Sequence, residues 1–325
     1  MGLILSLAAG VIPMVIYAAV LTWFDRYEKE PPLLLAGVFL WGALVAAGAA
    51  LIINTLFDVG LIFATGSETA ASIGTSVLVA PFVEETVKGL GVVAVFVYFY
   101  REFDSLLDGV LYGSLVGFGF AAAENVNYIF FSGFAVSGLE GLLVNAIVRV
   151  VVVAFLHATL TACTGIGLAV ARLNRGWLRY AAPLLGYGTA VFLHAFHNGL
   201  ASLGSTALCL LGSAIDWLGF VGLFIFILAL VWREGRIMQE HLREEVQAGL
   251  LTPDQYRAAC SLTGQFTARW GALGRGRFRQ AGQLYDKCGE LAFKKYQLAR
   301  VGAERETHGA VDILRGEIGA LSKAV

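Results

Sequence analysis

The stretch "VAPFVEETVKGLGVVAVF", residues 79–96, places two adjacent glutamates and a lysine inside an otherwise apolar run. A charged side chain near the centre of a bilayer costs at least about 2.5 kcal/mol, so Glu84, Glu85 and Lys88 must be either paired or used. Glu84 and Lys88 stand four positions apart, in the order that favours pairing on one helix face. We therefore expect Lys88 to neutralise one carboxylate and leave the other free.

The composition extends this membrane character to most of the chain. Of the 325 residues, 58% are hydrophobic and 14% are charged, whereas soluble domains average about 25% charged residues. Residues 1–231 hold 8 of the 23 Lys and Arg residues, and residues 232–325 hold the other 15. The sequence predicts an all-α, multi-pass protein of the cell membrane, with a transmembrane domain at 1–231 and a cytoplasmic helical tail at 232–325.

About 20 apolar residues are needed to cross the hydrocarbon core as a helix. Seven segments satisfy this length: 3–24, 33–53, 74–100, 109–131, 142–171, 180–203 and 207–231. Among the connections only alternate ones contain Lys or Arg, and the positive-inside rule then predicts an outer N-terminus and an inner C-terminus. Residues 54–73 are interpreted as an interfacial segment or partial hairpin, because an eighth span would invert half of that pattern.

The fourth predicted span carries a glycine stripe, with Gly109, Gly113 and Gly117 at four-residue spacing. Residues at this spacing share one face of a helix. Small side chains on such a face allow the backbone of another helix to approach closely. We interpret the stripe as a packing surface.

The tail has helix signals of its own. Thr252 and Pro253 are suited to the N-cap and first positions of a helix. A second helix is predicted to have an amphipathic face made of Ala281, Leu284, Cys288, Leu291 and Tyr296. We expect a small helical hairpin or bundle whose arginines, around 269–279, lie near the anionic inner leaflet or are simply solvated. The sequence indicates no partner for it.

Further costly polar groups occur in the other predicted spans, namely Glu124, Arg149, His157, His194 and Asn198. At about 1.5 Å of rise per residue, four helices bring these groups and the two carboxylates of the 74–100 span to the outer half of the bilayer. Such convergence favours one water-accessible site. A carboxylate could activate water there, while imidazole and amide groups stabilise an oxyanion. Arg149 alone could instead extend to the outer interface, where we also expect Asp216.

A proton- or ion-coupled transporter would use similar residues, and a non-catalytic membrane scaffold could bind partners through the same pocket. The clustering in one half of the bilayer favours an enzyme, because a transport path would place polar groups across the full thickness. The zinc-protease motif HExxH does not occur.

Five motifs together resemble one known family. They are "DRYEKEPP" at 25–32, "APFVEETVKG" at 80–89, FxxxEN at 120–125, "VRVVVVAFLHATLTACTGIGLA" at 148–169 and "HAFHNGLA" at 194–201. Their order resembles that of the PrsW-type intramembrane proteases, part of the group that includes the Abi/CAAX-type membrane endopeptidases. The resemblance implies cleavage of a single-span membrane protein near the outer leaflet, such as an anti-sigma factor. The expected partners are this substrate and the lipid bilayer, with no nucleic acid.

The resemblance also implies roles for individual residues. Glu84 resembles the water-activating carboxylate, Glu85 would support it or bind a metal, and Lys88 would balance charge. His194 and Asn198 match the HxxxN motif, which resembles an oxyanion site.

The chain departs from the CAAX enzymes at Glu124, which stands where they have a histidine, and His157 is a candidate to supply that imidazole. The candidate Zn²⁺ ligands are Glu85, Glu124, His157 and His194. A metal-free glutamate mechanism would use the same residues, so both alternatives stay open.

Overall fold

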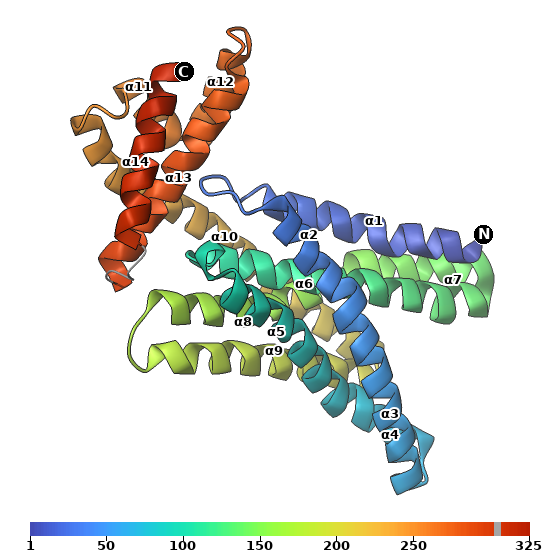
Figure 1. Ribbon diagram of the computed structural model, residues 1–325. Coiled ribbons are helices and arrows are strands. Elements are labelled where there is room, and N and C mark those ends of the chain that lie inside the picture. The colour runs from blue at the N-terminus through green and yellow to red at the C-terminus, as the bar shows by residue number, and fades with distance from the viewer. Residues whose placement is uncertain (302–306) are drawn as a thin grey trace. The chain divides into compact units, whose positions relative to one another are not determined.

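The computed structural model describes residues 1–301 and 307–325, in which all regular structure is helical (Figure 1). The elements are α1 (Gly2–Thr22), α2 (Pro32–Leu40), η1 (Trp41–Ala46), α3 (Ala47–Thr65), α4 (Glu68–Gly74), η2 (Thr75–Val79), α5 (Ala80–Tyr98), η3 (Tyr100–Glu102), α6 (Leu106–Asn127), η4 (Tyr128–Phe134), α7 (Ala135–Ile147), η5 (Val148–Val152), α8 (Leu156–Leu173), α9 (Leu178–Ser202), α10 (Thr206–Gln247), α11 (Pro253–Ala259), α12 (Leu262–Leu273), α13 (Phe278–Val301) and α14 (Thr307–Ala324). η1, η2, η4 and η5 are π-helical turns, and η3 is one 3₁₀ turn.

Several helical stretches have the length and composition of membrane spans. Within the described residues, four such stretches are Gly2–Thr22, Pro32–Thr65, Leu106–Leu173 and Thr206–Gln247. Helix α5, which carries three charged residues, is outside this set. The all-helical prediction is confirmed, whereas the count of seven spans and the N-out, C-in orientation stay predictions.

Two predicted boundaries were wrong. The second span does not end at residue 53 but continues as α3 to Thr65, where Gly66 adopts φ +67° and Ser67 caps α4. Residues 54–73 are therefore mostly helical and form a hairpin.

The predicted helix at 142–171 is interrupted at residues 153–155, between η5 and α8. It is also preceded by a sharp break inside α7, where Gly138 adopts φ +62°. Beyond that break Gly141 packs closely against Gly133 of η4. The interruption has a consequence for the site, because His157 lies in the first turn of α8 and not near the middle of a span.

The glycine stripe is a packing surface, as predicted. Gly109, Gly113 and Gly117 of α6 face the backbone of α8 at Gly165, Thr161 and His157. A Cβ atom at any of the three would come closer than 3.0 Å to a backbone atom of α8. Because backbone cannot rotate away as a side chain can, these glycines fix the distance between α6 and α8.

Gly117→Ala is expected to destabilise the protein by about 1–3 kcal/mol, the usual cost of overpacking a tight contact. The added methyl group would press on the His157 carbonyl group and displace the start of α8. The measurement is unfolding in mixed micelles. Gly188→Ala in α9 is the matched control, since no atom lies within 4 Å of its added Cβ. Equal stability of the two variants would contradict the packing role.

The chain divides into two compact units. The first comprises Met1–Thr22, Pro31–Arg172 and Gly176–Ile225, and the second comprises Trp23–Glu30, Leu173–Arg175 and Phe226–Val325. In the second unit Thr252 caps α11 with Pro253 at its first position, as predicted. The predicted apolar face of α13 is also confirmed, because Ala281, Leu284, Cys288 and Leu291 are fully buried and Tyr296 is half-buried.

The second unit also buries a carboxylate, Glu245 at the end of α10. Lys295 lies 2.9 Å from Glu245 Oε1, and Arg315 donates to both Glu245 oxygens. Burial alone raises the pKa of the Glu245 carboxyl, but the hydrogen bonds from Arg315 and Lys295 outweigh it and hold this pKa below its usual value. The ion pairs of Glu245 with Lys295 and Arg315 therefore stabilise the folded state above the usual pKa of a glutamate carboxyl. This stabilisation is lost as the pH falls through the lowered pKa of Glu245.

Candidate active site

The first unit contains a cleft of about 750 Å³ whose walls carry most of the predicted site residues. Each of the four π-helical turns contributes to these walls, for example through Ala43 of η1, Ser76 of η2, Tyr128 of η4 and Arg149 of η5. π-Turns bend a helix and are frequent at functional sites. The π-helical turns thus coincide with the cleft.

Lys88 and Glu85 do not line the cleft; both are fully buried and pair with each other. The Lys88 Nζ atom lies 2.5 Å from Glu85 Oε1 and 3.9 Å from Glu84 Oε2. The same ammonium group stacks over the Phe120 ring at 4.3 Å and contacts His157 Nδ1 at 3.1 Å. Lys88 therefore neutralises Glu85 more directly than Glu84, although the i, i+4 spacing favoured Glu84.

Glu85 is fully buried and uses both oxygens in hydrogen bonds. Besides Lys88, Oε1 contacts His194 Nδ1 at 2.9 Å, and Oε2 accepts a hydrogen bond from Thr161 at 3.2 Å. A carboxylate held in this way orients the His194 ring. Glu85 was expected either to support Glu84 or to bind a metal, and in the structure both of its oxygens already have hydrogen-bond partners.

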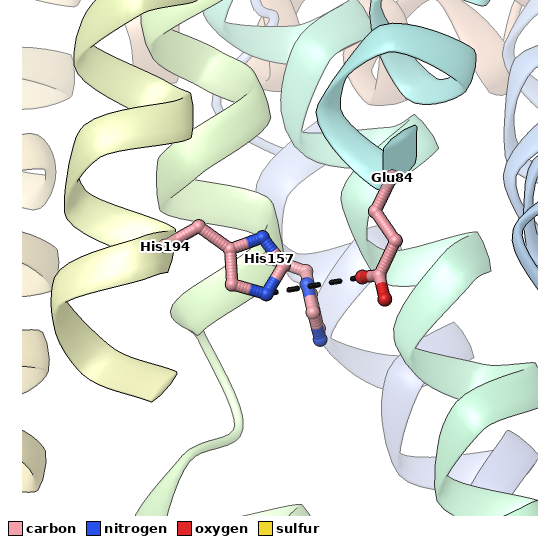
Figure 2. A group of neighbouring side chains, drawn as sticks. All are labelled: Glu84, His157 and His194. Carbon is pink, nitrogen blue, oxygen red and sulfur yellow. Dashed lines mark ion pairs between the residues drawn. The ribbon is translucent and has the colours of Figure 1, made fainter. Parts of the chain in front are cut away.

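Glu84 lines the cleft. Its Oε1 atom accepts a hydrogen bond from Asn54 Nδ2 at 3.3 Å, whereas Oε2 is buried and has no hydrogen-bond partner among the described residues. This free oxygen lies 3.8 Å from His194 Nε2. Figure 2 shows Glu84, His157 and His194 converging from α5, α8 and α9.

These three residues have a donor set suited to a metal ion. One ligand atom from each of Glu84, His157 and His194 can be chosen so that all lie within 4.8 Å of one another. Two histidines and a carboxylate are a known zinc set, and the Glu85 contact to His194 Nδ1 leaves His194 Nε2 for the metal. The unpartnered Glu84 Oε2 atom fits the same role.

The second histidine, His157, is more constrained. Its Nε2 atom lies 2.8 Å from Glu124 Oε2, and Lys88 occupies the Nδ1 side. Glu124 is in turn bonded by Arg149, whose Nε atom also donates to Asn125 Oδ1 at 3.0 Å. Glu124 thus orients His157, and metal binding through His157 would replace one of its present contacts. Arg149 itself lines the cleft.

Asn198, the predicted oxyanion donor, lines the cleft but uses one of its N–H groups on the Ser76 carbonyl group, at 2.8 Å. This contact joins α9 to η2. The amide has two N–H groups, so one remains for another acceptor.

The sequence analysis did not foresee the positions of two other polar side chains, Asn54 and Asp216. Asn54 was missed, although an amide within the apolar run of α3 is the kind of residue that marks a function in a membrane. Asp216 was expected at the interface, and it lies 2.7 Å from His197 Nδ1.

Comparison with known proteins places the chain in a family. A family model described as PrsW family intramembrane metalloprotease matches residues 30–232. Protease PrsW of Geobacillus kaustophilus is 31% identical over 232 residues, which cover 70% of this chain and 87% of that protein. Protease PrsW of Bacillus subtilis is 28% identical over 196 residues, covering 59% of this chain and 80% of that protein.

No solved structure matches the chain. The family model spans more than half of the chain, and the Geobacillus protein is covered over most of its length. The apolar helices agree with a multi-pass membrane protein. The chain therefore belongs to the PrsW family of intramembrane proteases.

Proposed function

We propose that the protein hydrolyses a peptide bond of a single-span membrane protein, such as an anti-sigma factor, at the outer-leaflet side of the membrane. The observation that supports this proposal most is that Glu84 lines the cleft and that its Oε2 atom has no hydrogen-bond partner among the described residues, 3.8 Å from His194 Nε2. A carboxylate with an unoccupied oxygen can accept a proton from water. The cleft volume of about 750 Å³ accommodates a short peptide segment.

In the proposed reaction Glu84 Oε2 removes a proton from a water molecule whose oxygen attacks the carbonyl carbon of the substrate. The resulting oxyanion is stabilised by the His194 imidazole and by the remaining N–H group of Asn198. Glu84 then returns the proton to the amine nitrogen as the C–N bond breaks. Glu85, held by Lys88 and Thr161, keeps His194 in position throughout.

The metal-dependent form of this proposal assigns Glu84, His157 and His194 as ligands of a Zn²⁺ ion. Such an ion would lower the pKa of a bound water and polarise the substrate carbonyl group. This set replaces Glu85 and Glu124 of the sequence-based prediction by Glu84, because both of those carboxylates are engaged by a cation and a histidine.

The test is cleavage of a single-span reporter by purified protein, with and without a zinc chelator, combined with measurement of bound zinc. If metal is required, the chelator abolishes cleavage and added Zn²⁺ restores it. His157→Ala and His194→Ala should then lose zinc, whereas His197→Ala should retain it. Cleavage that persists in chelator, with no zinc bound, would assign a metal-free glutamate mechanism. Failure of the wild-type protein to cleave any such reporter would contradict the proposed function.

Asn54→Leu is expected to lower kcat by about 10-fold, a typical cost of removing a group that orients a reacting carboxylate. Leucine keeps the approximate shape of Asn54 but removes the N–H group that holds Glu84 Oε1. Asn54→Gln, which retains the amide, should recover part of the activity. The measurement is the steady-state rate of reporter cleavage, separated into kcat and KM. A rise in KM with unchanged kcat would exclude the positioning role.

A further inference from the structure

The second unit has an exposed aromatic surface at α12 and the turn into α13. Phe266, Trp270, Leu273 and Phe278 are 57%, 52%, 51% and 38% exposed. The ring centroids of Phe266 and Trp270 lie 5.9 Å apart, and those of Trp270 and Phe278 lie 5.4 Å apart. The three aromatic rings thus form one continuous cluster, and clustered exposed aromatic groups mark interaction surfaces.

This surface is also strongly basic. Residues 255–285 contain five arginines and no aspartate or glutamate. Arg275, Arg277 and Arg279 are exposed beside Phe278, and no ion pair joins any of them to a carboxylate of the described residues. Arg277 also donates a hydrogen bond to the Val325 carbonyl oxygen at 3.3 Å. We call the four apolar side chains and these three arginines the α12 patch.

Other basic residues of the same unit are used differently. Lys287, Lys295 and Arg315 all form ion pairs with glutamates of the unit. Arg269, which precedes Trp270, pairs with Asp286. Within the described residues Arg277 of the α12 patch has a hydrogen bond to Val325, whereas Arg275 and Arg279 form no ion pair, so most of the positive charge of the patch is not neutralised within the unit.

We propose that the α12 patch binds the anionic headgroup surface of a phospholipid bilayer. Aromatic rings prefer the boundary between headgroups and acyl chains, and arginines beside them attract anionic lipids. The tail is covalently joined to the apolar part of α10, so a bilayer is always within its reach. Twofold self-association is disfavoured, because it would bring two sets of unpaired arginines together. This inference does not depend on the proposed proteolysis.

The test compares amide hydrogen exchange of the full chain in nanodiscs of phosphatidylcholine and in nanodiscs that also contain phosphatidylglycerol. Peptides covering residues 263–281 should exchange about 10-fold more slowly in the anionic nanodiscs, as expected for three arginines near a charged surface. The combined variant Arg275→Gln, Arg277→Gln and Arg279→Gln should remove this difference. Trp270→Ser should reduce it. Arg257→Gln is the matched control, since Arg257 is exposed on α11 and pairs with Asp254; it should keep the full difference.

Equal exchange in the two kinds of nanodisc would overturn the proposal. Equal loss of protection in Arg257→Gln and in the triple variant would also overturn it, because the effect would then reflect net charge and not the patch. Protection that increases with the number of protein copies per nanodisc, whatever the lipid, would assign the surface to a second copy of the chain instead.

Discussion

Glu84→Gln is expected to reduce reporter cleavage by about 10³-fold, within the range that a general base contributes. Glutamine keeps the shape of Glu84, and its carbonyl oxygen can still accept the Asn54 hydrogen bond. The Lys88–Glu85 pair at 2.5 Å is untouched, so the buried charge balance beneath the cleft persists. The variant should therefore be folded but inactive.

Glu85→Gln provides the contrast to this variant. This substitution removes the negative charge closest to the fully buried Lys88 and alters the group that contacts His194 Nδ1. We therefore expect loss of stability together with loss of activity. Unfolding in mixed micelles and cleavage rates, measured on the same preparations, separate the two effects. If Glu84→Gln retains wild-type cleavage, Glu84 is not the base. If it unfolds as readily as Glu85→Gln, the assignment of different roles to the two carboxylates is wrong.

Much of this site was predictable because charged residues in an apolar sequence have few explanations. Glu84, Glu85 and Lys88 stand out from the composition alone, and the glycine spacing of α6 predicted the close approach of another helix, which is α8 in the structure. The structure brings Glu84 and Glu85 together with His157 and His194 across three helices. The sequence predicted which residues form the cluster, because each of these polar groups is energetically costly in a bilayer unless it contacts the others.

The pairing within the cluster was less predictable. Helical spacing places both glutamates within reach of Lys88, and only the packing of α8 and α9 decides that Glu85 takes the lysine. The end of α3 and the break before α8 were also missed, because hydropathy measures the length of apolar runs and not the backbone angles within them. His157 consequently lies at a helix start, a position that hydropathy could not reveal.

Lys88→Met is expected to destabilise the protein by about 3–5 kcal/mol, the usual cost of leaving one member of a buried ion pair without the other. Glu85 would remain fully buried without the ammonium group now 2.5 Å away. The His157 Nδ1 atom would lose its donor as well. The measurement is the free energy of unfolding in mixed micelles of mild and denaturing detergent.

The double variant Lys88→Met and Glu85→Gln decides whether this cost comes from the unpaired charge. Removing both charges removes the electrostatic penalty and leaves only changes in packing and hydrogen bonding, so the double variant should be more stable than Lys88→Met alone by about 2 kcal/mol. The matched pair Lys88→Met and Glu84→Gln should show less recovery, since Glu84 lies 3.9 Å from Lys88 and is not its closest partner. Equal recovery in both combinations would mean that the two carboxylates share the lysine, and the distinction between a neutralised Glu85 and a reactive Glu84 would fail with it.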